Sequence, residues 1–69
     1  MDMRKLVGRN AARLRQAAGL TQEQLAERSG FSQQYISKLE KGRRSPTIVT
    51  LYELATGLDA TPADLVRPD

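Results

Sequence analysis

Residues 21–42, TQEQLAERSGFSQQYISKLEKG, contain the local signals for two short helices separated by a tight turn. Thr21 followed three residues later by Gln24 is a capping box, in which each side chain hydrogen-bonds the backbone of the other. This pair predicts a helix over about 22–29. Gly30 then ends the helix, because glycine readily adopts the left-handed conformation found after a helix C-terminus.

The second half of the stretch predicts another helix directly after the turn. Ser32 is a favourable N-cap for a helix over about 33–41, and Gly42 ends it. Phe31 is the only Phe in the chain, and we expect it to fill the angle between the two helices. The stretch is therefore predicted to form a helix-turn-helix.

The polar face of the second predicted helix contains amides, a hydroxyl and ammonium groups but no carboxylate. At about 100° per residue this arc comprises Gln33, Ser37, Lys41, Gln34 and Lys38. Ile36 and Leu39 lie on the opposite side and are expected to be buried. Gln can bond adenine, Lys can donate to guanine and Ser can serve either base, so the face suits the major groove of DNA. The alternative is an ordinary solvated helix face, which the tight turn and the neighbouring basic residues disfavour.

Length and composition restrict the fold to a small helical domain. Sixty-nine residues form one domain at most. The chain has no Cys and no His, which excludes disulfides, zinc fingers and His-dependent catalysis. Aromatic residues make up only 4% of the chain, and good helix formers predominate. We therefore expect an all-α fold without a cofactor or a metal.

Charge is distributed unevenly along the chain. Residues 1–44 carry ten of the eleven Lys and Arg against four acidic residues, whereas residues 45–69 carry one Arg against four acidic residues. The first part is therefore predicted to face a polyanion. The alternative is a solvated surface with uneven charge.

One helix is expected before the central stretch. It runs from about Met3 to Ala18, with its apolar residues on one stripe, and Gly19 ends it in a left-handed conformation. No segment has the length and apolar character of a signal peptide or a membrane span, so we expect a cytoplasmic protein without membrane contact.

Two further helices are expected after the central stretch. The first begins with either Ser45 or Thr47 as its N-cap. Its predicted apolar face consists of Ile48, Leu51, Leu54, Ala55 and Leu58. Thr61 and Pro62 begin a last short helix. Residues 1–69 are therefore predicted to form a single compact five-helix bundle, in which the last two helices support the helix-turn-helix from behind.

Several motifs together carry a resemblance to a known family. They are residues 15–22 (RQAAGLTQ), 25–26 (LA), 35–42 (YISKLEKG) and Pro46. In this combination the chain resembles the lambdoid phage repressor and Cro proteins, the XRE family of helix-turn-helix transcriptional regulators. The resemblance covers nearly the whole chain and implies a lambda repressor-like fold with the helix over 33–41 as recognition helix.

The resemblance assigns DNA contacts to individual side chains. It implies that base edges are read by Gln33, Gln34, Ser37 and Lys38. It implies that backbone phosphates are bound by Gln22, Lys41, Arg43 and Arg44. Tyr35 is expected either to touch a phosphate or a thymine methyl group, or to pack against Phe31.

The resemblance also implies a structural ion pair between Arg15 and Glu40, which ties the first helix to the end of the recognition helix. One departure from the family is Asn10 with Ala11, where the family often carries a larger aliphatic residue. This departure predicts a thin core at that point.

We expect a sequence-specific regulator that binds double-stranded DNA as a homodimer on a palindromic operator. The expected dimer surface consists of Val49, Tyr52, Leu65 and Val66, which could equally close the small core. The alternative is an antitoxin-like or other helical interaction module whose main contact is an unknown partner protein. RNA binding is disfavoured because exposed aromatic platforms are lacking. An enzyme is not expected, because no nucleophile has an activating base nearby in the sequence pattern.

Overall fold

A computed structural model describes residues 2–68 of the chain. These residues form five helices, namely α1 (Met3–Ala17), α2 (Gln22–Ser29), α3 (Gln33–Glu40), α4 (Ile48–Gly57) and α5 (Pro62–Val66). No strand occurs among them, so the prediction of an all-α fold with five helices is confirmed. None of these helices has the length and apolar character needed to cross a membrane.

Side-chain caps begin the helices where the sequence predicts them. The capping box that opens at Thr21 is complete. At the start of α3 the Ser32 hydroxyl accepts a hydrogen bond from the Tyr35 N–H. Of the two candidate caps for α4, the chain uses Thr47, whose hydroxyl accepts from the Thr50 N–H. These short-range bonds satisfy N–H groups that would otherwise lack a partner in the first turn of each helix.

Two helices end one residue earlier than predicted. Ala18 and Lys41, which the predictions include in the helices, are instead the C-caps of α1 and α3. Gly19 has a φ of 74°, as expected for the residue that follows the C-cap.

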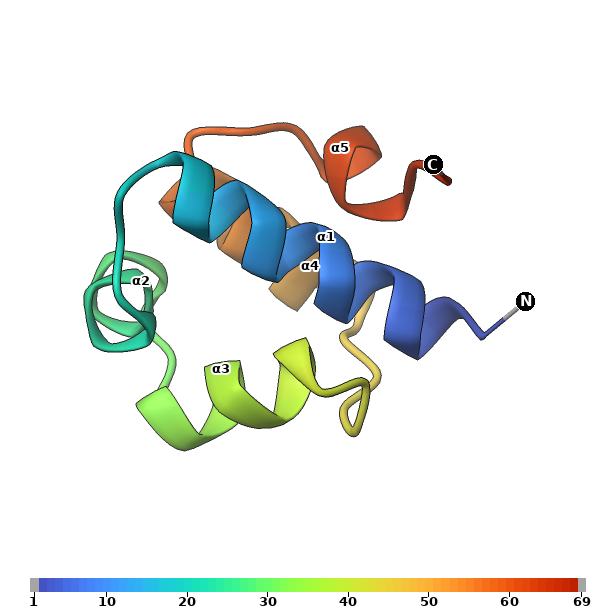
Figure 1. The fold of residues 1–69 in the computed structure, drawn as a ribbon, viewed down its shortest axis with the longest axis horizontal. Coiled ribbons are helices and arrows are strands. Elements are labelled where there is room, and N and C mark those ends of the chain that lie inside the picture. The colour runs from blue at the N-terminus through green and yellow to red at the C-terminus, as the bar shows by residue number, and fades with distance from the viewer. Residues whose placement is uncertain (1, 69) are drawn as a thin grey trace.

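Helix α1 lies between α3 and α5, packing against each of them (Figure 1). Helix α2 packs against α3 and α4, and α4 also packs against α5. The buried hydrophobic cluster between the helices consists of Ala11, Leu25, Ala26, Ile36, Leu39, Leu54, Ala55, Leu58 and Leu65. Every helix contributes to this cluster, so the two helices of the helix-turn-helix are held by the same core as the other three.

Two apolar residues lie where the predictions do not place them. Leu65 is completely buried in the core, so its assignment to a dimer surface is wrong, and it closes the core instead. Ile48 is 84% exposed although it was predicted to lie on the buried face of α4. The reason is that the buried residues of α4 lie in its second half, which leaves Ile48, the first residue of the helix, outside the core.

Asn10 is fully buried in α1. Its Nδ2 donates to the backbone carbonyls of Leu65 and Arg67, each at 2.9 Å. Its Oδ1 accepts from Arg13 Nη2 at 2.8 Å. The prediction of a thin core at this point is therefore wrong. The site is filled by a hydrogen-bonded amide that ties the end of α5 to α1.

Candidate nucleic-acid interface

The turn between α2 and α3 is fixed by backbone geometry. Gly30 has a φ of 80°, a conformation that glycine adopts without the steric cost of a Cβ. The N–H groups of Gly30 and Phe31 both donate to the Ala26 carbonyl, at 2.9 and 3.0 Å. Together with the Ser32 cap, these bonds turn the chain sharply and set the direction of α3 relative to α2.

The outer face of α3 is free to meet a partner. Gln33, Gln34 and Lys38 are exposed, and Ser37 is half-buried. Their side chains form no hydrogen bond with any other residue in the range 2–68. On the opposite side, Ile36 and Leu39 are completely buried. This helix therefore presents unpaired polar groups on a rigidly held backbone.

A hydrogen-bonded group around Glu40 joins three helices. Arg15 Nε and Nη2 donate to the two Glu40 carboxylate oxygens at 2.7 and 3.1 Å. Arg15 Nη1 donates to the Leu20 carbonyl at 2.8 Å, and Gln22 Nε2 donates to Glu40 Oε1 at 3.0 Å. The Arg15 and Glu40 side chains are only 13% and 8% exposed. Paired geometry and shielding make this group a strong link between α1, the start of α2 and the end of α3.

The link engages a residue that the resemblance assigns to DNA. Gln22 uses its amide nitrogen on Glu40, so a phosphate contact by Gln22 stays a prediction. The first turn of α2 nevertheless lies at the positive end of that helix, where backbone N–H groups favour an anion.

Close backbone packing also holds the end of α3. A Cβ at Gly8 would clash with the Leu39 carbonyl oxygen and would lie 2.9 Å from the Glu40 carbonyl oxygen. Only glycine therefore lets α1 approach α3 this closely. The role of Gly8 could not be predicted from the sequence, because the contact depends on how the two helices cross.

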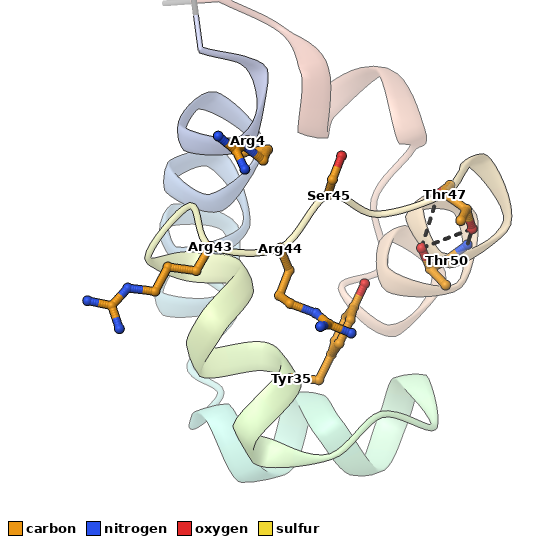
Figure 2. Close-up of a pocket in the computed structure, with 7 residues that line it drawn as sticks. All are labelled: Arg4, Tyr35, Arg43, Arg44, Ser45, Thr47 and Thr50. Atoms are coloured by element: carbon orange, nitrogen blue, oxygen red, sulfur yellow. Dashed lines mark hydrogen bonds between the residues drawn. The ribbon is translucent and has the colours of Figure 1, made fainter.

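A basic hollow lies beside the recognition helix (Figure 2). It has a volume of about 500 Å³ and is lined by Arg4, Tyr35, Arg43, Arg44, Ser45, Thr47 and Thr50. We call it the arginine hollow. Three of the lining residues are arginines and the other four carry hydroxyl groups, and no acidic residue lines it. This chemistry suits a phosphate group, because Arg donates to phosphate oxygens through paired N–H groups.

The arginine hollow brings together residues that are far apart in the sequence. Arg43 and Arg44 were predicted to bind backbone phosphates, and a phosphate contact was one of the alternatives predicted for Tyr35. No DNA contact was predicted for Arg4, although it lies outside the apolar stripe of α1. Its place beside the loop that precedes α4 depends on tertiary packing, which the sequence pattern does not show. Lys41 is exposed at the end of α3 and does not line the hollow.

Tyr35 lies between two other side chains. Its ring stacks on Phe31, with centroids 4.7 Å apart and planes inclined by 28°. Arg44 Cζ lies 5.2 Å from the Tyr35 ring centroid, a distance at which a guanidinium is attracted to the ring face. Packing against Phe31 and contact with a phosphate or a thymine methyl group were predicted as alternatives for Tyr35. The ring packs against Phe31 and also lines the arginine hollow, so this packing does not exclude a phosphate contact, which stays a prediction.

Exposed apolar side chains also lie on α4 and at the end of α5. Val49 and Tyr52 are each 63% exposed, and Ile48 and Val66 are exposed as well. With Leu65 assigned to the core, Val49, Tyr52 and Val66 remain of the predicted dimer surface, and Ile48 is added to them. We call these four residues the α4–α5 patch.

A metal site is not found in the described part of the chain. Between residues 2 and 68, no three acidic, His or Cys side chains come close enough together to bind a metal ion. The polar face of α3 and the arginine hollow instead present hydrogen-bond donors and cations, which bind anions.

The fold and this surface define a helix-turn-helix protein that binds DNA. A family model described as Helix-turn-helix, HTH_3, matches residues 12–65, and the chain belongs to this family. This confirms the resemblance that the sequence motifs carry. The chain is a DNA-binding transcriptional regulator and not an enzyme.

Proteins similar to this chain are named transcriptional regulators or control proteins. The chain is 65% identical over 68 residues to the HTH-type transcriptional regulator y4dJ of Sinorhizobium fredii, covering 99% of this chain and 88% of that protein. It is 38% identical over 61 residues to the control protein C.SmaI of Serratia marcescens, covering 88% and 73% respectively. The crystal structure of the restriction-modification controller protein C.AhdI from Aeromonas hydrophila superimposes with a TM-score of 0.86 at 39% identity, covering 90% of each chain.

Proposed function

We propose that α3 enters the major groove and that Gln33, Gln34, Ser37 and Lys38 read base edges there. The observation that carries this proposal is the exposed face of α3, which has no carboxylate and lies opposite a completely buried apolar back. Amide side chains can bond adenine at two atoms at once, and Lys can donate to guanine. This chemistry supports recognition of one operator sequence over others.

The backbone of the same DNA is bound beside α3. Arg43, Arg44 and Tyr35 contact phosphates from the arginine hollow, together with Arg4. Lys41 and Gln22 contribute at the ends of α3 and α2. Such contacts supply binding to any sequence and make the affinity strongly dependent on salt. The base contacts then supply the choice of sequence.

The regulator binds as a homodimer to a palindromic operator. The α4–α5 patch supports this proposal, because exposed apolar side chains favour association with another protein surface. Two copies related by twofold symmetry would read half-sites about 34 Å apart, which is one turn of DNA. A regulator of this kind acts where the chromosome lies, in the bacterial cytoplasm.

Selection of binding sites from a random duplex library tests the proposed function. The expected result is one enriched inverted repeat, from which the half-site sequence and spacing follow. Weak binding to every duplex, even as the salt concentration is lowered, would reject a sequence-specific regulator. That result would favour the antitoxin-like alternative, in which a partner protein is the main contact.

A further inference from the structure

We propose that Phe31 is a positioning residue for DNA binding, which acts through Tyr35 to hold the Arg44 guanidinium in the arginine hollow. The inference rests on the proposed function, because it takes Arg44 to bind a backbone phosphate. Its new element is the role of the turn residue, which itself does not line the hollow.

The Arg44 side chain depends on another residue to hold its guanidinium in place. Arg44 is exposed in the loop between α3 and α4, and no hydrogen bond or ion pair from the described residues holds its guanidinium. Its guanidinium carbon lies over the Tyr35 ring, 5.2 Å from the ring centroid. Figure 2 shows the Arg44 side chain lying along this ring. A long side chain held in its binding position loses less rotamer freedom when it meets DNA, and this raises affinity.

The Tyr35 ring can support Arg44 only if another residue holds the ring in place. No residue in the range 2–68 hydrogen-bonds the Tyr35 hydroxyl group, so polar contacts do not fix the ring. Phe31 stacks on one face of it. Because a stacked ring occupies that face, Arg44 must lie over the other one. The Tyr35 ring is therefore held between Phe31 and the guanidinium that it supports.

Both the backbone and the side chain of Phe31 are held by the fold. Its N–H donates to the Ala26 carbonyl at 3.0 Å, and its half-buried side chain packs against the hydrophobic core. Phe31 in the turn therefore fixes the Tyr35 ring. The Tyr35 ring in turn positions the Arg44 guanidinium, which is proposed to bind DNA. If Phe31 only filled the angle between α2 and α3, replacing it would change stability but would not act through Arg44.

A double-mutant cycle on binding to a short mixed-sequence DNA duplex separates these roles. Phe31→Leu keeps an apolar side chain but removes the ring, whereas Phe31→Tyr keeps a ring that can stack. We expect Phe31→Leu to weaken binding about two- to fivefold, as for loss of an exposed cation–π contact. Phe31→Tyr should bind like the unaltered protein. In a chain that already carries Arg44→Ala, Phe31→Leu should have no further effect.

Circular dichroism at the binding temperature verifies that each variant is folded. An equal loss from Phe31→Leu with and without Arg44→Ala would overturn the positioning role while leaving the proposed function intact. If Arg44→Ala alone left binding and its salt dependence unchanged, the phosphate contact itself would be wrong, and the inference would fall with it. A loss in Phe31→Tyr as large as that in Phe31→Leu would also overturn it.

Discussion

Asn10 places a polar side chain among the core residues of α1, where an aliphatic residue was expected. Its amide donates to two carbonyls near the end of α5 and accepts from Arg13. A buried amide with all these partners costs little, whereas its removal leaves buried carbonyls without donors. The Asn10 side chain therefore ties the end of α5 to α1.

Asn10→Ala should lower the free energy of unfolding by about 2 to 4 kcal/mol, because three hydrogen bonds are lost and a cavity forms. Chemical denaturation measures this change. Gln16→Ala, at an exposed position of the same helix, is the control and should change stability by less than about 0.5 kcal/mol. An Asn10→Leu variant more stable than the unaltered protein would contradict the role given to the amide.

Helix boundaries and helix contacts differ in how far the sequence predicts them. The starts of α2, α3 and α5 follow from caps such as Thr21 and Ser32, because a cap bonds its own neighbours in the chain. The burial of Leu65 and the exposure of Ile48 could not be predicted in this way, since burial depends on which other helix lies opposite. The same limit applies to Arg4, which joins the arginine hollow only through packing of α1 beside the loop.

Gly8 is the clearest contact of this kind, because it sets the distance between α1 and the end of α3. Gly8→Ala should lower the free energy of unfolding by about 1 to 3 kcal/mol, although alanine is the better helix former, because the added methyl group meets backbone carbonyls that have little room to move. Thermal and chemical denaturation measure the change. A gain in stability would show that the two helices can separate freely.

The whole molecule separates its binding surface from its supporting elements. Helix α3 and α5 lie on different sides of α1 (Figure 1). The basic residues of the first part of the chain include the three arginines of the hollow beside α3. Residues 45–69 carry the acidic excess, and the exposed α4–α5 patch lies in this part of the chain. We therefore expect DNA binding and association of two copies to use separate surfaces.

Association of two copies through the α4–α5 patch predicts a specific effect of charge. Ile48→Glu should shift the protein toward monomers in analytical ultracentrifugation and weaken binding to a two-half-site duplex by about tenfold or more. Its thermal stability as a monomer should change little, because Ile48 is largely exposed. Gln16→Glu adds the same charge on α1 and should leave association unchanged. A fully dimeric Ile48→Glu protein would exclude this residue from the interface.

The most direct test of the central claim compares base-reading with phosphate-binding residues on selected and unrelated duplexes. Gln33→Ala or Gln34→Ala should cost about 1 to 3 kcal/mol on the selected site only, and relax the choice of base at one position. Arg43→Ala should weaken binding to both duplexes alike and lower the slope of log affinity against log salt by about one. If the two kinds of variant lost the same affinity on both duplexes, α3 would not be the element that reads the sequence.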